Sequence, residues 1–261
     1  MSDAKGALIT GAAQRIGRCI AESLASQGWH VVVHHNTSSA AAAETVEAIS
    51  AARGTATALQ ADLSDPASCG QLVADAAAAT GGLGCLINSA SLFVEDGLDN
   101  FEVETFDRTM AVNLRAPLLL SQAFAAQVPD GGEGVIVNIL DQKLANPNPD
   151  FLSYTVSKYG LAGLTEMLAM SLGPRVRVCA VAPGLTLPSG DQPVAQFESV
   201  HGRTPLARGS TPEDVAGAVV YLLGARAVTG ETILVDGGQH LVPSAHDVMF
   251  LDLDPAKDDN E

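Results

Sequence analysis

Aromatic residues are scarce in this sequence of 261 residues: they make up 4% of it, whereas hydrophobic residues of all kinds make up 47%. Basic residues are scarce too, since 14 of them stand against 30 acidic ones and the formal net charge is −16. That charge disfavours nucleic acid and anionic membranes as partners, although local basic sites can still bind phosphate. The sequence lacks an apolar run long enough to span a membrane, and its first residues lack the pattern of a signal peptide. We therefore expect a cytoplasmic protein that binds a small molecule.

Cysteine is rare as well. The four cysteines, Cys19, Cys69, Cys85 and Cys179, are scattered along the chain without the spacing of metal ligands. Three of them lie in apolar or Ala-rich surroundings. We therefore expect reduced packing residues and no metal site.

Ala, Val, Leu and Gly are abundant, which is typical of buried parallel strands covered by Ala-rich helices. Short apolar runs alternate with helical spacing and predict an α/β fold: a doubly wound Rossmann fold with a seven-stranded, mainly parallel sheet and helices on both faces. No linker or repeat divides residues 1–250, so we expect one domain there, followed by an acidic tail at 251–261. Residues 187–208 have the composition of a mobile lid. The expected strands are residues 7–10, 30–34, 55–60, 85–88, 135–139, 176–181 and 231–238.

The most informative stretch follows the fifth expected strand. Asp141 stands at the end of that strand, and the apolar spacing from Tyr154 to Leu172 predicts a helix. Tyr154 and Lys158 are four residues apart and would share one face of its first turns. A neighbouring cation stabilises a phenolate and lowers the pKa of tyrosine from about 10 towards neutral. Tyr154 is therefore a candidate general acid beside Asp141, although such a pair also suits an ordinary surface helix.

A glycine turn marks a second candidate site. The first expected strand leads into a small-residue turn that contains Gly11, Arg15, Ile16 and Gly17 and opens a helix. N–H groups and the helix dipole face one point in such a turn, which suits a pyrophosphate. A plain strand-to-helix connection has the same pattern, so the turn alone leaves both interpretations open.

The end of the second expected strand indicates which dinucleotide is bound. Enzymes that use NAD usually carry an acidic residue there, which binds a ribose 2′-hydroxyl. This sequence has His34, His35 and Asn36 instead, so no carboxylate repels a 2′-phosphate, and Arg15 can pair with one. We therefore expect NADP(H). The alternative is that these are solvated loop residues and Arg15 is a surface charge.

Small and polar residues follow three further strands, and ligands bind outside the carboxyl ends of parallel strands. They are Asp62 and Leu63 after the third, Asn88, Ala90, Ser91 and Phe93 at and after the fourth, and Pro183, Gly184 and Leu185 after the sixth. Asp62 can accept from an adenine amino group or help to cap the helix after it. Phe93 is either a stacking platform for a flat substrate or an ordinary loop anchor.

Residues 103–127 predict a long helix that is interrupted near Pro117, with Asn113 in its middle. Asparagine is mildly unfavourable inside a helix, so we expect its side chain to make a specific hydrogen bond.

Together these motifs resemble the short-chain dehydrogenase/reductase family over essentially the whole folded length. The matching motifs are Thr10-Gly11-x-x-x-Arg15-Ile16-Gly17, Asn88-Ser89-Ala90-Ser91, Asn113, Tyr154-x-x-x-Lys158 and Pro183-Gly184. The resemblance implies hydride transfer from a nicotinamide cofactor, with Tyr154 as proton donor and Lys158 holding the ribose and lowering the pKa of the tyrosine. It also implies a water-linked proton path at Asn113 and a homotetramer assembled through helices near residues 106–127 and 154–172.

Two residues depart from that family's usual pattern: Arg15 replaces a glycine, and Asp141 replaces a serine. Both departures resemble the pteridine reductase branch, which shares an arrangement like Ala90-Ser91-Leu92-Phe93. This resemblance implies that Phe93 stacks on a pterin, that Ser91 contacts it, and that Asp141 works with Tyr154 in proton delivery. Arg15 becomes a phosphate contact, and Thr37 stands where that branch often has a basic residue.

The leading hypothesis is an NADPH-dependent reductase of a dihydropterin such as dihydromonapterin, dihydrobiopterin or dihydrofolate. Its substrate contacts would be Ser91, Phe93, Asp141, Tyr154 and Leu185. The alternative enzyme is a general carbonyl reductase of 3-oxoacyl thioesters or other ketones, and a non-catalytic dinucleotide-binding regulator is a third possibility.

Overall fold

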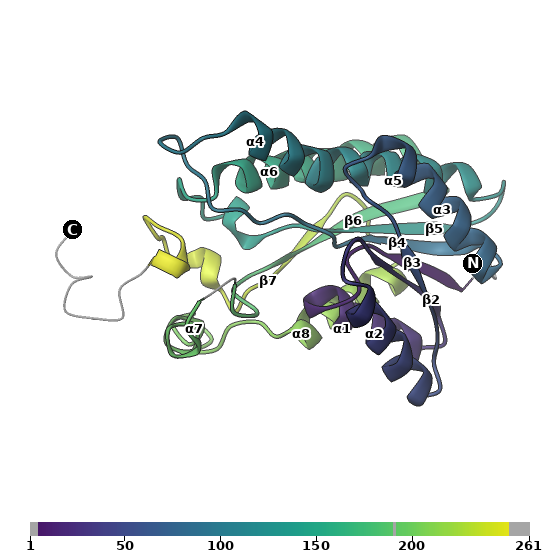
Figure 1. Cartoon of the computed structure of the whole chain (residues 1–261), viewed down its shortest axis with the longest axis horizontal. Helices are drawn as coiled ribbons and strands as arrows, with labels where there is room; N and C mark the ends of the chain where they lie inside the picture. The colour runs from purple at the N-terminus through teal and green to yellow at the C-terminus, as the bar shows by residue number, and fades with distance from the viewer. Residues whose placement is uncertain (1–4, 190–191, 251–261) are drawn as a thin grey trace.

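A sheet of seven parallel strands forms the centre of the molecule in the computed structural model, which describes residues 5–189 and 192–250 (Figure 1). Across the sheet the strands are β3 (Thr55–Gln60), β2 (His30–His35), β1 (Gly6–Ile9), β4 (Leu83–Asn88), β5 (Gly134–Ile139), β6 (Val176–Pro183) and β7 (Thr232–Val235). The chain crosses from β3 to β4 on the other side of β1, and this reversal of direction opens a crevice at the carboxyl ends. The predicted doubly wound Rossmann fold is confirmed.

Helices cover both faces of the sheet, with α1, α2 and α8 on one face and α3 to α6 on the other (Figure 1). The helices are α1 (Arg15–Ser26), α2 (Ser39–Ala51), α3 (Pro66–Thr80), α4 (Val103–Met110), α5 (Ala116–Gln127), α6 (Leu152–Leu172), α7 (Val194–His201) and α8 (Pro212–Gly224). The predicted lid stretch contains α7, at the carboxyl edge of the sheet. Its role as a lid remains a prediction, and the acidic tail at 251–261 lies outside the described residues.

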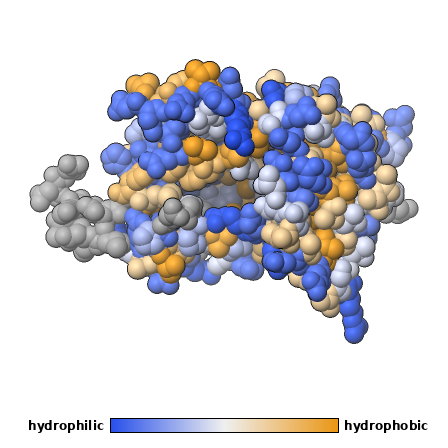
Figure 2. All heavy atoms as spheres, in the orientation of Figure 1, coloured by the Kyte–Doolittle hydropathy of each residue, from blue (hydrophilic) through white to orange (hydrophobic). Residues whose placement is uncertain are grey.

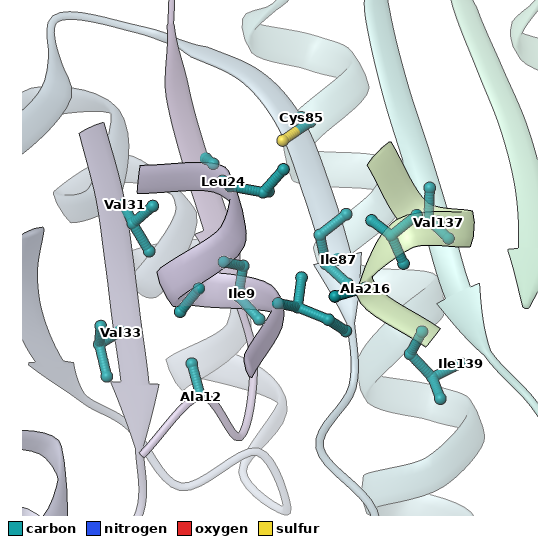
Figure 3. Close-up of a cluster of buried hydrophobic side chains, with 14 of the residues drawn as sticks. Ile9, Ala12, Leu24, Val31, Val33, Cys85, Ile87, Val137, Ile139 and Ala216 are labelled. Carbon is teal, nitrogen blue, oxygen red and sulfur yellow. The ribbon is translucent and has the colours of Figure 1, made fainter. Parts of the chain in front are cut away.

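Alternating side chains of the strands build two apolar cores. Ile9 points to the face of α1 and α8, while its neighbour Leu8 points to the face of α3 and α5. Figure 3 shows the first of these cores, in which Leu24 of α1 and Ala216 of α8 meet the side chains of β1, β2, β4 and β5. Because both faces of each central strand are buried, these strands read as continuous apolar runs in the sequence.

The long helix predicted for residues 103–127 is interrupted earlier than expected. A π-helical turn occupies Ala111–Arg115, and Pro117 lies in the first turn of α5 behind it. The N–H of Ala116 bonds to the carbonyl of Ala111, five residues earlier. Pro117 has no N–H to continue the regular ladder, and the chain accommodates that loss by widening the preceding turn. The turn holds Asn113, so the irregularity lies at a predicted site residue.

Candidate active site

A cavity of about 1140 Å³ lies at the carboxyl ends of the strands, and Figure 2 shows this face of the molecule hollowed. Most of the residues predicted from the sequence are brought together there. Those that line the cavity are Gly11, Arg15, Ile16, Gly17, His34, Asn36, Asp62, Leu63, Ala90, Ser91, Phe93, Asp141, Tyr154, Lys158, Pro183, Gly184 and Leu185. The sheet therefore assembles one site from segments that are far apart in the sequence.

Tyr154, Asp141 and Lys158 form a buried group in this cavity. The Tyr154 hydroxyl donates a hydrogen bond to Asp141 Oδ2 at 2.7 Å. Lys158 Nζ donates to the carbonyl of Ile139 at 2.8 Å and lies 5.4 Å from the centre of the Tyr154 ring. Asp141 Oδ1 accepts from the backbone N–H of Lys143 at 2.8 Å. An acid, a phenol and an ammonium thus meet in one water-poor place, which is an arrangement suited to proton transfer.

Burial dominates the pKa values of all three groups. It raises the pKa of Asp141 above its ordinary value of 3.8, and the hydrogen bonds from Lys143 and Tyr154 and the charge of Lys158 oppose this only in part. It lowers the pKa of Lys158 from 10.5 to about 8, although the charge of Asp141 acts in the opposite direction. Because burial disfavours the charged form of each group, the pKa of the carboxyl and the pKa of the ammonium move towards each other.

The prediction that Lys158 lowers the pKa of Tyr154 is wrong for this structure. The pKa of Tyr154 is raised well above 10, first by burial and then by the negative charge of Asp141 and the hydrogen bond to it. A carboxylate in direct contact disfavours the phenolate more strongly than an ammonium over the ring favours it. Tyr154 consequently holds its proton at neutral pH and is a donor.

Phe93 forms an aromatic wall beside this group. Its ring stacks on Phe151 with centroids 4.1 Å apart and an interplanar angle of 17°, and it meets the Tyr154 ring at 89° with centroids 4.7 Å apart. Phe93 is 40% exposed and lines the cavity. One ring face is therefore supported by protein while other parts of the ring remain available to a flat ligand.

Asp96 fixes the Phe93 loop to the helix that carries Tyr154. Its carbonyl accepts from the N–H of Leu152, and its carboxylate accepts from both the N–H and the hydroxyl of Ser153. These are N–H groups of the first turn of α6, which lack partners within the helix. Asp96 is 5% exposed. Its role could not be predicted from the sequence, because a carboxylate in a loop 57 residues before its helix leaves no local signal.

The other half of the cavity is a cradle of close backbone. A Cβ on Gly17 would lie 2.4 Å from the carbonyl oxygen of Gly11, and one on Gly11 would lie 2.9 Å from Cα of Ala90. Thr10 Oγ1 accepts from the N–H groups of Ser89 and Ala90, both at 3.0 Å, which fixes the loop after β4 against the turn. No acidic residue lies in the first turn of α1. This half therefore fits a pyrophosphate at a helix N-terminus.

His34 and Arg15 hold that cradle in different ways. His34 Nδ1 accepts from the N–H of Gly11 at 3.1 Å, and its Nε2 lies 3.1 Å from the carbonyl of Ala61. Both ring nitrogens are thus committed to protein. Arg15 has φ of 57° and donates from Nη1 to the carbonyl of Pro188 at 2.9 Å. Arg15 also lines the cavity, and a guanidinium has further N–H groups that can donate to a phosphate.

Three predicted residues lie behind the cavity wall. Asn88 turns inward and donates to Asn138 Oδ1 at 2.8 Å. His35 is buried, with Nδ1 at 3.2 Å from the carbonyl of Asn36. Asn113 makes the expected specific hydrogen bonds: it pairs with both the N–H and the carbonyl of Leu92, at 2.8 and 2.9 Å, and donates to Ser157 Oγ at 3.0 Å. From the π-helical turn, the Asn113 side chain thus fixes the backbone of Leu92, next to Phe93.

The cavity carries more positive charge than the chain as a whole. Among the described residues, five basic ones line it, compared with three carboxylates, in a chain of net charge −16. The basic residues are Arg15, Arg108, Lys143, Lys158 and Arg203, and the acidic ones are Asp62, Asp141 and Asp247. Such a local excess attracts phosphate groups to one place on an otherwise acidic protein. Arg108, Lys143 and Asp247 come from segments without a motif, so the sequence did not reveal them.

Two further findings limit the kinds of site in the described residues. No group of three or more His, Cys, Asp or Glu side chains there is arranged to hold a metal ion. No helix in that part of the chain has the length and apolar character needed to cross a membrane.

The fold and the proton-transfer group together define a Rossmann-fold oxidoreductase. Residues 11–240 match a family model described as enoyl-(acyl carrier protein) reductase. The chain belongs to the short-chain dehydrogenase/reductase family.

Three relatives are informative about its place in that family. The crystal structure of FolM alternative dihydrofolate reductase 1 from Brucella canis, complexed with NADP, is 39% identical and has a TM-score of 0.87, covering 91% of this chain and 94% of that one. Pteridine reductase 1 from Leishmania tarentolae is 32% identical over 90% of this chain and 96% of its own length. The granaticin polyketide synthase putative ketoacyl reductase 2 from Streptomyces violaceoruber is 35% identical over 92% of this chain and 98% of its own length.

Proposed function

We propose that this protein is an NADPH-dependent reductase that transfers hydride to a pterin, most specifically a dihydropterin such as dihydromonapterin, dihydrobiopterin or dihydrofolate. The observation that carries the proposal is the 2.7 Å hydrogen bond from Tyr154 to a buried Asp141, beside the ring of Phe93. The similarity to FolM alternative dihydrofolate reductase 1 and to pteridine reductase 1 supports it.

NADP(H) is the cofactor that the cradle favours. Two polar uncharged side chains, Gln14 and Asn36, line the cavity near the end of β2, and no carboxylate stands at the strand end. A ribose 2′-phosphate would therefore meet hydrogen-bond donors without repulsion. The NADP complex of the FolM structure supports this choice.

The reaction adds a hydride and a proton across a C=N bond of the pterin. A nicotinamide cofactor held by the cradle around Gly11, Arg15 and Gly17 would supply the hydride to the carbon. The residues of this chain supply the proton to the neighbouring nitrogen. Tyr154 holds its proton at neutral pH and donates it, and Asp141, once it is protonated and donates to Tyr154 in return, passes that proton to the Tyr154 oxygen. Lys158, over the tyrosine ring, stabilises the negative charge left at this pair. No atom of the chain is oxidised or reduced.

The aspartate distinguishes a C=N substrate from a ketone. A serine donates a hydrogen bond to a carbonyl oxygen at any neutral pH, whereas a carboxylate donates only when it is protonated. Asp141 therefore handicaps reduction of an ordinary ketone and suits a substrate whose nitrogen takes up a proton. The ring of Phe93 adds a flat contact for a bicyclic heterocycle.

A general carbonyl reductase is the second candidate, because the ketoacyl reductase relative is 35% identical, which lies between pteridine reductase 1 at 32% and the FolM structure at 39%. Tyr154 and Lys158 would serve that reaction in the same positions. The two candidates differ in how much each needs Asp141 and Phe93.

The test is steady-state oxidation of NADPH between about pH 5 and 8, the range in which general acid–base groups of an enzyme are expected to control its rate. Dihydrobiopterin and dihydromonapterin are compared with a 3-oxoacyl thioester. We expect saturable pterin turnover that rises as the pH falls, and a loss of at least about 100-fold in Tyr154→Phe. Tyr159→Phe is the matched control, since its hydroxyl only donates to the carbonyl of Leu144 at 3.1 Å. Normal NADPH binding with thioester turnover alone would replace the pterin assignment by the carbonyl one.

A further inference from the structure

Lys143 is a buried cation two residues after Asp141, and it is 2% exposed. A lysine is almost never buried to this degree unless it is paired. Its ammonium donates to the carbonyl of Asp150 at 2.6 Å and to Asp247 Oδ2 at 3.3 Å, and lies 5.3 Å from the centre of the Phe151 ring. Its backbone N–H donates to Asp141. Lys143 therefore contacts both Asp141 of the proton-transfer group and Phe151, the ring on which Phe93 stacks.

The partner of Lys143 belongs to the C-terminal segment, residues 239–250, which lines the substrate half of the cavity. Several contacts besides the ion pair attach this segment, among them a 3.4 Å contact between His246 and the Asp150 carboxylate and a hydrogen bond from Gln196 to the carbonyl of Met249 at 2.9 Å. Three more link it to residues 146–151. The N–H of Asp247 donates to Asp150 Oδ2 at 2.6 Å, Asn146 donates to the carbonyl of Val242 at 2.7 Å, and the ring of Phe250 stacks on Phe151 with centroids 5.7 Å apart. The ion pair is thus one of several links between this wall and the loop of Asp141, and it is the one that involves a buried ammonium.

Phe151 lies between the C-terminal segment and the Phe93 loop. Phe250 of the C-terminal segment stacks on it, and so does Phe93 of the loop after β4. It has φ of 55° and is 2% exposed, and the Lys143 ammonium lies over its ring. A cation over an aromatic face contributes more when it is desolvated, as here.

We propose that Lys143 is a positioning residue for the substrate. Through Asp247 it holds residues 239–250 as one wall of the substrate half of the cavity, and through Phe151 it keeps Phe93 in place opposite that wall. The identity of the substrate rests on the proposed function, whereas the positioning of the wall does not.

The charges of Lys143 and Asp247 should also affect the pKa of Asp141, which a purely structural role of Lys143 would not. Asp141 faces Tyr154 and Lys158 of α6 and the C-terminal Asp247, whose charge contributes to raising the pKa of both Asp141 and Tyr154. Asp247 in turn faces Lys143, and the carboxylate of Asp150 faces His246 at 3.4 Å. Removing the carboxylate of Asp247 should lower the pKa of Asp141. Removing the ammonium of Lys143 leaves Asp247 unpaired and should raise it.

The experiment uses the full chain and compares Lys143→Met, Lys143→Arg and Asp247→Asn, with the substrate that the wild type reduces. We expect the substrate KM to rise roughly tenfold in Lys143→Met and Asp247→Asn, because the wall is no longer held, with the NADPH KM within about twofold. Lys143→Arg keeps the cation and should restore the wild-type KM. The midpoint of the pH profile should move up in Lys143→Met and down in Asp247→Asn.

Arg226→Met is the matched control, since it breaks the exposed 3.1 Å ion pair with Glu133 near the amino ends of the strands. It should change neither the substrate KM nor the pH profile. Unchanged substrate KM in a folded Asp247→Asn variant overturns the inference, and this variant decides the question even if Lys143→Met does not fold. A pH midpoint that moves in the same direction in both variants overturns it too.

Hydrogen exchange of residues 239–250 separates this inference from the proposed function. Exchange there should accelerate in Lys143→Met and Asp247→Asn and not in Arg226→Met, whatever the substrate is. Unaltered exchange in both variants overturns the positioning role. A wild-type protein that reduces no pterin, but shows the accelerated exchange in the variants, overturns only the proposed function.

Discussion

His34 should make the stability of the protein depend on pH through the cofactor cradle. Its ring is 2% exposed, accepts at Nδ1 from the N–H of Gly11, and lies with Nε2 against the carbonyl of Ala61. This pattern requires the neutral ring with its proton on Nε2. Burial lowers the pKa of His34 from 6.5 to about 4, and a smaller contribution comes from His35, although the Ala61 carbonyl opposes the change.

The sign and size of the effect follow from that pKa. Because the folded-state value is the lower one, the stability is present above the unfolded value and is lost as the pH falls through the folded value. The free energy of unfolding should fall by about 1.4 kcal/mol between neutral pH and pH 5.5, and by about 3 kcal/mol at pH 4. Protonation at Nδ1 also removes the acceptor for Gly11, so the turn should loosen as the histidine is charged.

Urea unfolding at several pH values between about 4 and 7.5 measures this, with His34→Asn as the test variant. The Asn oxygen can still accept from Gly11 but cannot take up a proton in this range. Its free energy of unfolding should approach that of the wild type, or exceed it, as the pH falls, while the difference at pH 7 stays constant with salt. His30→Gln, in the same strand and bonded to Thr57 at 3.0 Å, is the control. Parallel pH dependence in the wild type and His34→Asn would refute the reasoning.

Four further predictions concern the site. Asp141→Ser should weaken dihydropterin reduction by about 100-fold in kcat, since the second acid is gone, and equal or higher turnover in the steady-state assay would contradict the role of Asp141. Asp141→Asn should raise the free energy of unfolding at pH 7, measured in urea, because a raised pKa means that ionised Asp141 destabilises the folded state. The gain in stability should vanish in acid, where Asp141 is protonated in both states, and a gain that persists there would contradict this cause. Phe93→Ala should raise the pterin KM about threefold to tenfold with little change in NADPH binding, and an unchanged KM would mean that the ring does not face the substrate. Gly17→Ala should abolish NADP+ binding in calorimetry, because its Cβ would lie 2.4 Å from the Gly11 oxygen, and normal binding would show that the turn has another role.

The sheet and the position of the site were predictable from sequence for a physical reason. Strands buried on both faces are continuous apolar runs, and each is followed by the small or polar residues that a ligand site needs. Gly11, Asp141 and Gly184 follow three such strands, and the structure brings all three to one cavity. The cytoplasmic location and the homotetramer concern the surroundings of the chain and stay predictions.

Other features depend on contacts that no local pattern encodes. Lys143 and Asp247 are 104 residues apart, and the second of them follows the last motif of the chain. Asn88 and Asp62 fit a ligand-binding role equally well by sequence, yet Asn88 turns towards Asn138 while Asp62 lines the cavity. The pKa of Tyr154 was mispredicted although Asp141 was expected beside it, because the sequence shows neither how deeply the pair is buried nor that the two groups lie 2.7 Å apart. In each case the deciding quantity is a tertiary distance.

The pH dependence of the proposed reaction should belong to Asp141, Tyr154 and Lys158 jointly. The Tyr154 hydroxyl donates a hydrogen bond to Asp141 in this structure. Once Asp141 is protonated and donates to Tyr154 instead, the Tyr154 hydroxyl can donate to a substrate. Lys158 loses its charge above a pKa of about 8, and the charge left on the pair after proton transfer would then lack its neighbouring cation. Both effects reduce the rate as the pH rises. The three groups are close enough to titrate together. We therefore expect the rate to fall along a single alkaline limb whose midpoint belongs to all three groups, and no variant at one of them should show the same pH profile.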